Sequence, residues 1–210
     1  MNIHSQYVLL RRNFVLAEKK ATEVRREEII VASLSLVEQY GLDNLNIADI
    51  ARVVDLVPSA IYRHFGGKEA IIESLIEFAG ASLQGNISQA LIAESNAVDR
   101  LEVLFNLHVK LIKEQRAIPR ILFSLISSDK NMYLKQKMLL VINTYIANIK
   151  KIIAEGQLKG EILAEVDVRA AGILFLGMVQ PLAVLSQSDD DLINIYTAPL
   201  WELYRRGITR

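Results

Sequence analysis

Residues 46–69, NIADIARVVDLVPSAIYRHFGGKE, predict two short helices joined by a tight turn, with a third helix starting directly after them. Asn46 is a favoured N-cap residue, and Asp49 places a carboxylate in the first turn of the first helix. Apolar residues at helical spacing then give that helix one buried face. Pro58 suits the start of the next helix, because the N–H that proline lacks would have no partner there. The stretch therefore predicts a helix-turn-helix.

The second short helix, expected over residues 59–65, has two different faces. Ile61 and Phe65 share an apolar face. The opposite face combines small, hydroxyl, aromatic and basic side chains, which suits a recognition helix lying in the major groove of DNA. That face is expected to carry Ser59, Ala60, Tyr62, Arg63 and His64.

The spacing within this stretch resembles the helix-turn-helix of TetR/AcrR-type bacterial transcriptional regulators. The matching residues are Ile50-Ala51, Val57, Ile61-Tyr62-Arg63-His64-Phe65, Gly66-Gly67, Lys68-Glu69 and Ile71-Ile72. The resemblance extends loosely over residues 23–206. It implies an all-α fold, a homodimer that binds a palindromic double-stranded operator, and more often repression than activation.

The turn and the start of the recognition helix depart from the family pattern. Asp55 stands where the family usually has glycine, and aspartate tolerates the left-handed conformation better than most residues. Val57 replaces the usual hydroxyl N-cap. Lys68, at a helix N-terminus, would be stabilised by a phosphate. The DNA-binding residues predicted are Asn46, Pro58, Ser59, Ala60, Tyr62, Arg63, His64 and Lys68.

The composition of the whole chain excludes several classes of protein. The 210 residues include 24 basic and 24 acidic side chains and no cysteine. Zero net charge argues against a uniformly basic binder but leaves room for a local DNA-binding surface. Without cysteine there is no disulfide, thiol nucleophile or thiolate metal site. We expect no cofactor, no metal site, no membrane span and no signal peptide, and a cytoplasmic location.

The chain is expected to contain about nine helices in three regions. Residues 1–21 form a basic N-terminal extension, which either contacts DNA, frays, or packs on another surface. Residues 22–82 form a three-helix DNA-binding domain with the helix-turn-helix, and its first helix is expected over 22–40. Residues 83–210 form a helical effector-binding and dimerisation domain, with a boundary near 80–88, where Gly80, Gly85 and Asn86 weaken the helix.

Two C-terminal helices, expected over 167–186 and 192–204, are candidates for a dimer interface. The first is apolar almost all round, so it must be buried on more than one side. The second carries tryptophan and tyrosine, which are common at interfaces. An intrachain core is the alternative. The interface residues predicted are Ala171, Leu174, Met178, Leu185, Ile193, Tyr196, Leu200, Trp201 and Tyr204.

The helices between 98 and 158 are candidates for a ligand pocket, because the family resemblance implies one there. An apolar cavity with a few polar groups is the usual form of such a site. At each position the alternative is an ordinary core or surface residue. The ligand-binding residues predicted are Phe105, His108, Phe123, Met138, Tyr145 and Gln180.

These features predict a homodimeric transcriptional regulator, a repressor released from its operator by a small, mostly apolar ligand. The alternative is a DNA-binding dimer without a small-molecule ligand, controlled by a protein partner or serving a structural role. The sequence does not favour an enzyme, because it has no HExxH, GxSxG or P-loop motif.

Overall fold

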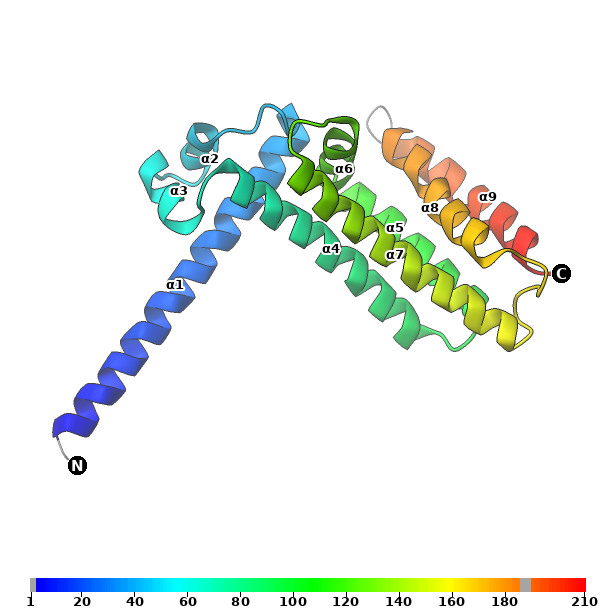
Figure 1. Cartoon of the computed structure of the whole chain (residues 1–210), viewed down its shortest axis with the longest axis horizontal. Coiled ribbons are helices and arrows are strands. Elements are labelled where there is room, and N and C mark those ends of the chain that lie inside the picture. The colour runs from blue at the N-terminus through cyan, green and yellow to red at the C-terminus, as the bar shows by residue number, and fades with distance from the viewer. Residues whose placement is uncertain (1–2, 186–189) are drawn as a thin grey trace. The chain divides into compact units, whose positions relative to one another are not determined.

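The computed structural model describes the backbone of residues 3–185 and 190–210, and the side chains of residues 22–185 and 191–210. Within these ranges the chain forms nine helices and no strand, which confirms the predicted all-α class (Figure 1). The chain divides into two compact units, Met1–Leu75 and Ile76–Arg210. Helix α4, Lys68–Ala93, begins in the first unit and ends in the second.

The N-terminal unit contains α1 (Ile3–Tyr40), α2 (Ile47–Val53), α3 (Pro58–His64) and the first turns of α4. The first helix was expected to start at Thr22, which is wrong, because α1 continues back to Ile3. The mixed polar and apolar pattern before Thr22 contains no proline or glycine that would stop a helix. The role predicted for the basic side chains of residues 1–21 lies outside the described side chains.

Local signals around the helix-turn-helix act as predicted. The Asn46 side chain accepts a hydrogen bond from the Asp49 backbone N–H at 2.9 Å, so it caps α2. Asp55 has φ +52°, the left-handed conformation expected where the family has glycine. Val57 makes no side-chain cap, and Pro58 opens α3. The start of each helix and the turn between them thus depend on residues that are close in sequence.

The core of the N-terminal unit joins α1, α2 and α3, which pack against one another. Its buried side chains come from each helix, from the connections that follow α1 and α3, and from the first turns of α4. They include Ile29, Val37, Leu45, Ile50, Ala51, Ile61, Phe65, Ile71 and Leu75.

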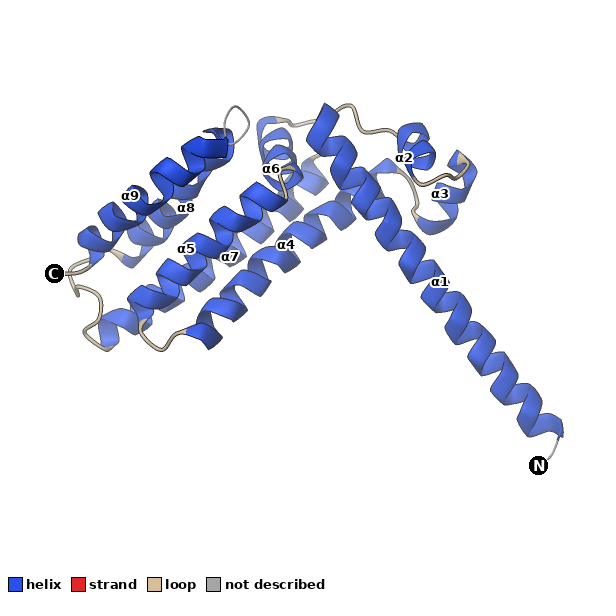
Figure 2. Ribbon diagram, turned by 180° about the vertical axis from the view of Figure 1, so that it is seen from behind, coloured by secondary structure: helices blue, strands red, loops and turns tan. Residues whose placement is uncertain are grey.

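The C-terminal unit contains the rest of α4 together with α5 (Ala97–Glu114), α6 (Ala117–Ser127), α7 (Met132–Leu158), α8 (Val168–Leu185) and α9 (Asp190–Ile208). Helix α5 packs against α7, α8 and α9, and α6 packs against α7. Within this unit α4 and the α8–α9 pair lie on opposite sides of α5 and α7 (Figures 1 and 2). Gly80, Gly85 and Asn86, which were expected to weaken the helix near the domain boundary, lie inside α4, which continues to Ala93.

An aromatic cluster fills the centre of the C-terminal unit. The Phe105 ring lies 6.1 Å from Phe175 and 6.0 Å from Trp201, and Tyr204 lies 5.6 Å from Phe175. Such aromatic pairs add to the stabilisation that comes from burial. The cluster therefore fixes α9 against α5 and α8 within one chain.

Helix α8 is the one helix, among the described residues, that is long and apolar enough to cross a membrane by length and composition alone. Core helices of proteins outside membranes pass the same test. Phe175, Val179 and Leu182 of α8 are buried in the core of the C-terminal unit.

Candidate DNA-binding surface and ligand pocket

Helix α3 presents an exposed surface that carries Pro58, Ser59, Tyr62 and Arg63. The Tyr62 side chain is 57% exposed although it is large and partly apolar. Exposed aromatic and basic groups on one face of a short helix are suited to contact with bases and phosphates. The helix therefore offers a short, chemically mixed surface of the kind predicted from the sequence.

Two residues of α3 that were predicted to face DNA, Ala60 and His64, are not fully exposed. Ala60 is only 3% exposed and packs beside Ile61 in the core, so its assignment to the exposed face is corrected. A small alanine lets α3 approach the neighbouring helices closely. His64 is half-buried, and its Nδ1 atom is buried without a hydrogen-bond partner among the described residues. Ala60 and His64 therefore pack at least partly against the core of the N-terminal unit.

Arg26 on α1 holds the C-terminal end of α3, a role not predicted from the sequence. Its guanidinium donates a hydrogen bond to the backbone carbonyl of His64. The same group lies 4.1 Å from the centre of the Phe65 ring, within range of a cation–π interaction. A cation at the C-terminus of a helix also complements the helix dipole. Arg26 is 38 residues from His64, so no local pattern could reveal the contact.

The two remaining predicted contacts, Asn46 and Lys68, already have partners. The Asn46 amide donates to the Asp49 carboxylate at 2.5 Å in addition to capping α2. Lys68 is half-buried, and its Nζ donates to the backbone carbonyl of Asp43 at 3.2 Å. Both side chains are thus held in place at the ends of the helices that carry them.

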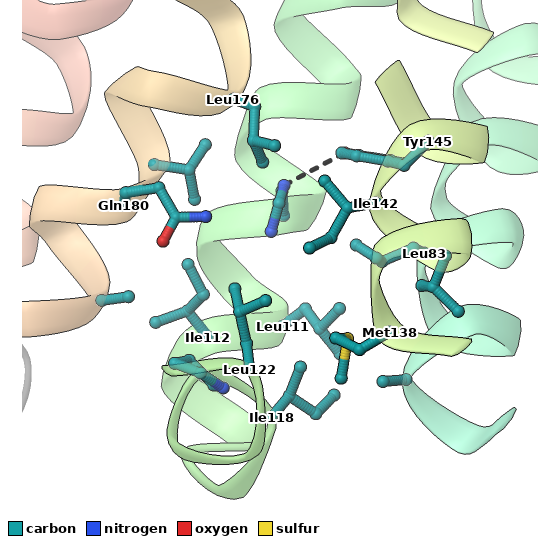
Figure 3. Close-up of a pocket in the computed structure, with 16 residues that line it drawn as sticks. Leu83, Leu111, Ile112, Ile118, Leu122, Met138, Ile142, Tyr145, Leu176 and Gln180 are labelled. Atoms are coloured by element: carbon teal, nitrogen blue, oxygen red, sulfur yellow. Dashed lines mark hydrogen bonds between the residues drawn. The ribbon is translucent and has the colours of Figure 1, made fainter. Parts of the chain in front are cut away.

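The C-terminal unit contains a pocket lined by α4, α5, α6, α7 and α8 (Figure 3). The cavity has a volume of about 50 Å³, room for a few water molecules. Its sixteen lining residues are apolar except for His108, Tyr145 and Gln180. The apolar residues are Ala79, Leu83, Leu111, Ile112, Ile118, Pro119, Leu122, Met138, Val141, Ile142, Leu176, Val179 and Ala183.

His108 and Tyr145 form a buried pair at one side of the pocket. The Tyr145 hydroxyl and His108 Nδ1 are 3.1 Å apart, a hydrogen bond drawn in Figure 3. Burial lowers the pKa of His108 to about 4 and raises the pKa of Tyr145 above its usual value. Both groups are therefore neutral at pH 7. The pocket offers hydrogen bonds without charge.

Four of the six predicted ligand-binding residues line the pocket: His108, Met138, Tyr145 and Gln180. Phe105 and Phe123 do not, which corrects their assignment. Phe105 instead stacks in the aromatic cluster, and Phe123 is half-buried elsewhere on α6. The aliphatic residues that line the pocket were not predicted from the sequence. Leucine and isoleucine at helical spacing look the same whether they face a cavity or a close-packed core.

Helices α8 and α9 carry a surface on which large apolar side chains are exposed. It is here called the α8–α9 stripe and consists of Ala170, Ile173, Leu174, Gly177, Pro181 and Val184 on α8 and Ile195, Tyr196, Pro199 and Leu203 on α9. The spacing of three or four residues places the members on one side of each helix. A contiguous exposed apolar surface of this kind is typical of a protein contact.

The stripe contains two of the predicted interface residues, Leu174 and Tyr196, while Leu185 and Leu200 are half-buried. The other five are corrected, because they lie in the core of the single chain. Trp201, for example, is 6% exposed and stacks on Phe105. Both α8 and α9 are apolar on two sides, and Trp201 lies on the side that packs within the chain. The corrected residues are Ala171, Met178, Ile193, Trp201 and Tyr204.

Comparison with known proteins agrees with this arrangement. The family model "Bacterial regulatory proteins, tetR family" matches residues 29–75, which contain α2 and α3. The family model "YsiA-like protein, C-terminal region" matches residues 80–195, more than half of the chain. A unit with a helix-turn-helix followed by a second helical unit is the arrangement of a DNA-binding regulator. The chain belongs to the TetR family of bacterial transcriptional regulators and not to an enzyme family.

Individual relatives are distant. The nucleoid occlusion factor SlmA of Vibrio cholerae is 26% identical over 157 residues, covering 74% of this chain and 80% of that protein. FadR of Bacillus subtilis, solved in complex with stearoyl-CoA, superposes with a TM-score of 0.73 at 23% identity, covering 87% of this chain and 98% of that one. PfmR of Thermus thermophilus superposes with a TM-score of 0.73 at 22% identity, covering 87% of this chain and 99% of that one. These superpositions show that the fold is shared.

Proposed function

We propose that this protein is a homodimeric, sequence-specific transcriptional repressor released from a palindromic operator by a small, mostly apolar ligand. The observation that carries the proposal is the exposed mixed surface of α3, held at both ends by Pro58 and Arg26, in a chain of a DNA-binding family. A regulator that binds the bacterial chromosome works in the cytoplasm.

The DNA contacts proposed are those of the residues that α3 exposes and of the start of α4. Pro58, Ser59, Tyr62 and Arg63 would face the major groove. Lys68 would bind a backbone phosphate, because both its ammonium and the α4 N-terminus favour an anion. Its present hydrogen bond to the Asp43 carbonyl keeps the ammonium at that helix start.

The α8–α9 stripe supports the homodimer. A twofold axis through this surface would pair α8 and α9 of two copies as a four-helix bundle and cover the exposed isoleucine and leucine side chains. Two recognition helices about 34 Å apart would then contact successive major grooves, as a palindromic operator requires.

The uncharged pocket supports an apolar ligand, as does the stearoyl-CoA bound to the FadR relative. A cavity of about 50 Å³ is far smaller than ordinary ligand sites. A ligand would therefore have to push the lining helices apart. Helix α4 contributes Leu83 to the pocket and Lys68 to the N-terminal unit, so one helix would carry that displacement toward the DNA contacts. The ligand would favour a conformation with weaker operator affinity.

A second candidate function is a DNA-binding dimer that is not controlled by a small molecule. The name of the SlmA relatives, nucleoid occlusion factor, favours it, because that name does not describe a ligand-controlled repressor.

One experiment tests DNA recognition and ligand control together. Selection of bound fragments from a random DNA pool should yield a palindrome, and a mobility shift should then give nanomolar affinity for it. Adding fractionated metabolite extracts should release the DNA. Failure to enrich any palindrome contradicts the repressor; a stable complex that no fraction releases favours the second candidate.

A further inference from the structure

The pocket contains one hydrogen-bonding arrangement whose direction can be worked out. Tyr145 is buried, and its hydroxyl hydrogen needs an acceptor. Among the described residues its one hydrogen-bond partner is His108 Nδ1, at 3.1 Å. The hydroxyl must therefore donate, and Nδ1 must accept. A neutral imidazole that accepts at Nδ1 carries its hydrogen on Nε2.

The Nε2–H group of His108 has no partner within the described part of the chain. The side-chain amide of Gln180 likewise makes no hydrogen bond to any described residue, and it points from α8 into the pocket (Figure 3). These two groups are the polar groups of the pocket that make no hydrogen bond to a described residue. The other lining residues are aliphatic, except for Met138 and Tyr145.

We infer that the pocket selects an uncharged aliphatic carbonyl compound, such as an ester or thioester, whose carbonyl oxygen accepts a hydrogen bond from His108 Nε2–H. The amide of Gln180 supplies a second donor to the same oxygen. The aliphatic chain lies among Leu83, Leu122 and Ile142. This inference rests on the proposed ligand control and names the chemistry that the ligand must have.

A free carboxylate is disfavoured for a physical reason. No lining residue carries a charge, and a carboxylate moved into such a site loses its hydration without gaining a cation. The His108 imidazole is neutral at pH 7, because burial lowers its pKa to about 4. A pure hydrocarbon is disfavoured less strongly, since it leaves the two donors without partners.

The test compares three probes that share an eight-carbon chain: methyl octanoate, octanoate and methyl octyl ether. Binding to the full-length protein is measured by calorimetry at pH 7.5. We expect the ester to bind about tenfold more tightly than the ether, because a carbonyl oxygen accepts a stronger hydrogen bond than an ether oxygen does, and more than tenfold more tightly than octanoate.

A double variant, His108→Phe with Tyr145→Phe, removes both members of the hydrogen-bonded pair. Changing both avoids leaving one buried polar group without a partner. Its preference for the ester over the ether should fall well below tenfold, because the Gln180 amide is then the one donor left for the carbonyl oxygen among the described lining residues. Met138→Leu, another lining residue, should keep the tenfold preference. Comparing two probes within one variant keeps the result independent of modest changes in stability.

The outcomes separate the inference from the proposed function. Equal binding of ester and ether by the wild-type chain overturns carbonyl selection but leaves a ligand pocket. Tighter binding of octanoate overturns the argument that the pocket excludes charge. Failure of all three probes to bind a protein that still binds its selected operator overturns both this inference and the proposed ligand control.

Discussion

The residues on and around helix α3 divide into those that are exposed to solvent and those that hold the helix in place. Tyr62 extends outward, while Ala60 and Ile61 pack inward on the same short helix. Arg26 reaches the end of that helix from α1 and joins a hydrogen bond to a cation–π contact. Substitutions at the two kinds of position should have separable effects.

Tyr62→Ala should weaken operator binding at least tenfold without lowering the melting temperature, because the side chain is exposed and contributes little to the core. Tyr40→Ala is the matched control, since Tyr40 is 61% exposed at the end of α1 in the same unit. A mobility shift at fixed salt measures both variants. Equal operator affinities for the two variants would show that Tyr62 does not contact DNA.

Arg26→Ala should lower stability by about 1 kcal/mol, or about 2–4 °C in apparent melting temperature, because it removes a cation–π interaction and a charged hydrogen bond. Arg25→Ala is the control: its guanidinium pairs with Glu28 at 2.6 Å between partly exposed side chains, and surface pairs contribute little. Thermal unfolding measures the difference. Equal melting temperatures for the two variants would contradict a holding role for Arg26.

The buried pair of His108 and Tyr145 links stability to pH. Burial lowers the pKa of His108 in the folded chain to about 4, while an unfolded histidine titrates near 6.5. The unfolded chain thus binds more protons between these values, and stability present above pH 6.5 is lost as the pH falls toward 4. Between pH 7.5 and 5 the loss should be about 2 kcal/mol.

The variant His108→Phe with Tyr145→Phe should lose less stability over that interval. Apparent melting temperatures at pH 7.5, 6 and 5 check this. Glu202, Asp129 and Asp167 have lowered pKa values, so their contributions are lost only at lower pH. Parallel pH profiles for variant and wild type would contradict a neutral buried His108.

At the scale of elements, helices α8 and α9 each have two apolar sides, one buried and one exposed. The inner side carries Phe175, Trp201 and Tyr204 and packs within the chain. The outer side is the α8–α9 stripe, whose small residues, Ala170 and Gly177, allow another helix to approach closely. Exposure, and not aromatic content, therefore separates the candidate interface from the core.

Ile173→Glu and Leu203→Glu should each convert the proposed dimer to a folded monomer, because each places a charge within the exposed apolar stripe. Ile92→Glu is the control, since Ile92 is 86% exposed on α4, on the opposite side of the same unit. Sedimentation gives the mass, and circular dichroism confirms folding. A dimeric Ile173→Glu variant would place the interface elsewhere.

At the scale of the whole molecule, a neutral chain distributes its charge unevenly. Residues 1–20 contain Arg11, Arg12, Lys19 and Lys20 against a single acidic residue, Glu18. The backbone of α1 is helical from Ile3, so these residues continue the first helix of the DNA-binding unit. A basic extension on a DNA-binding dimer would add electrostatic, sequence-independent affinity.

Deleting residues 2–20 should weaken operator binding and reduce its salt dependence, by about 0.9 in the slope of log affinity against log salt for each phosphate that the protein no longer neutralises. Mobility shifts from 50 to 200 mM salt, roughly the range over which such slopes are resolved, measure the change. Exchanging the four basic residues for glutamine in the full-length chain is the control that separates charge from length. An unchanged slope in both proteins would leave the extension without a phosphate partner.

The sequence by itself determined the helix-turn-helix, because its signals act between neighbours: the Asn46 cap, the left-handed Asp55 and Pro58 at the start of α3. Only the tertiary structure decided what each apolar or charged side chain meets. In the structure Ala60 and Trp201 are buried, and Phe105 lies in the aromatic cluster instead of the pocket. Arg26 contacts the end of α3. The physical reason is how far apart in the sequence the interacting residues lie. Capping and turn conformation depend on residues within about four positions, whereas burial depends on helices that are distant in the chain.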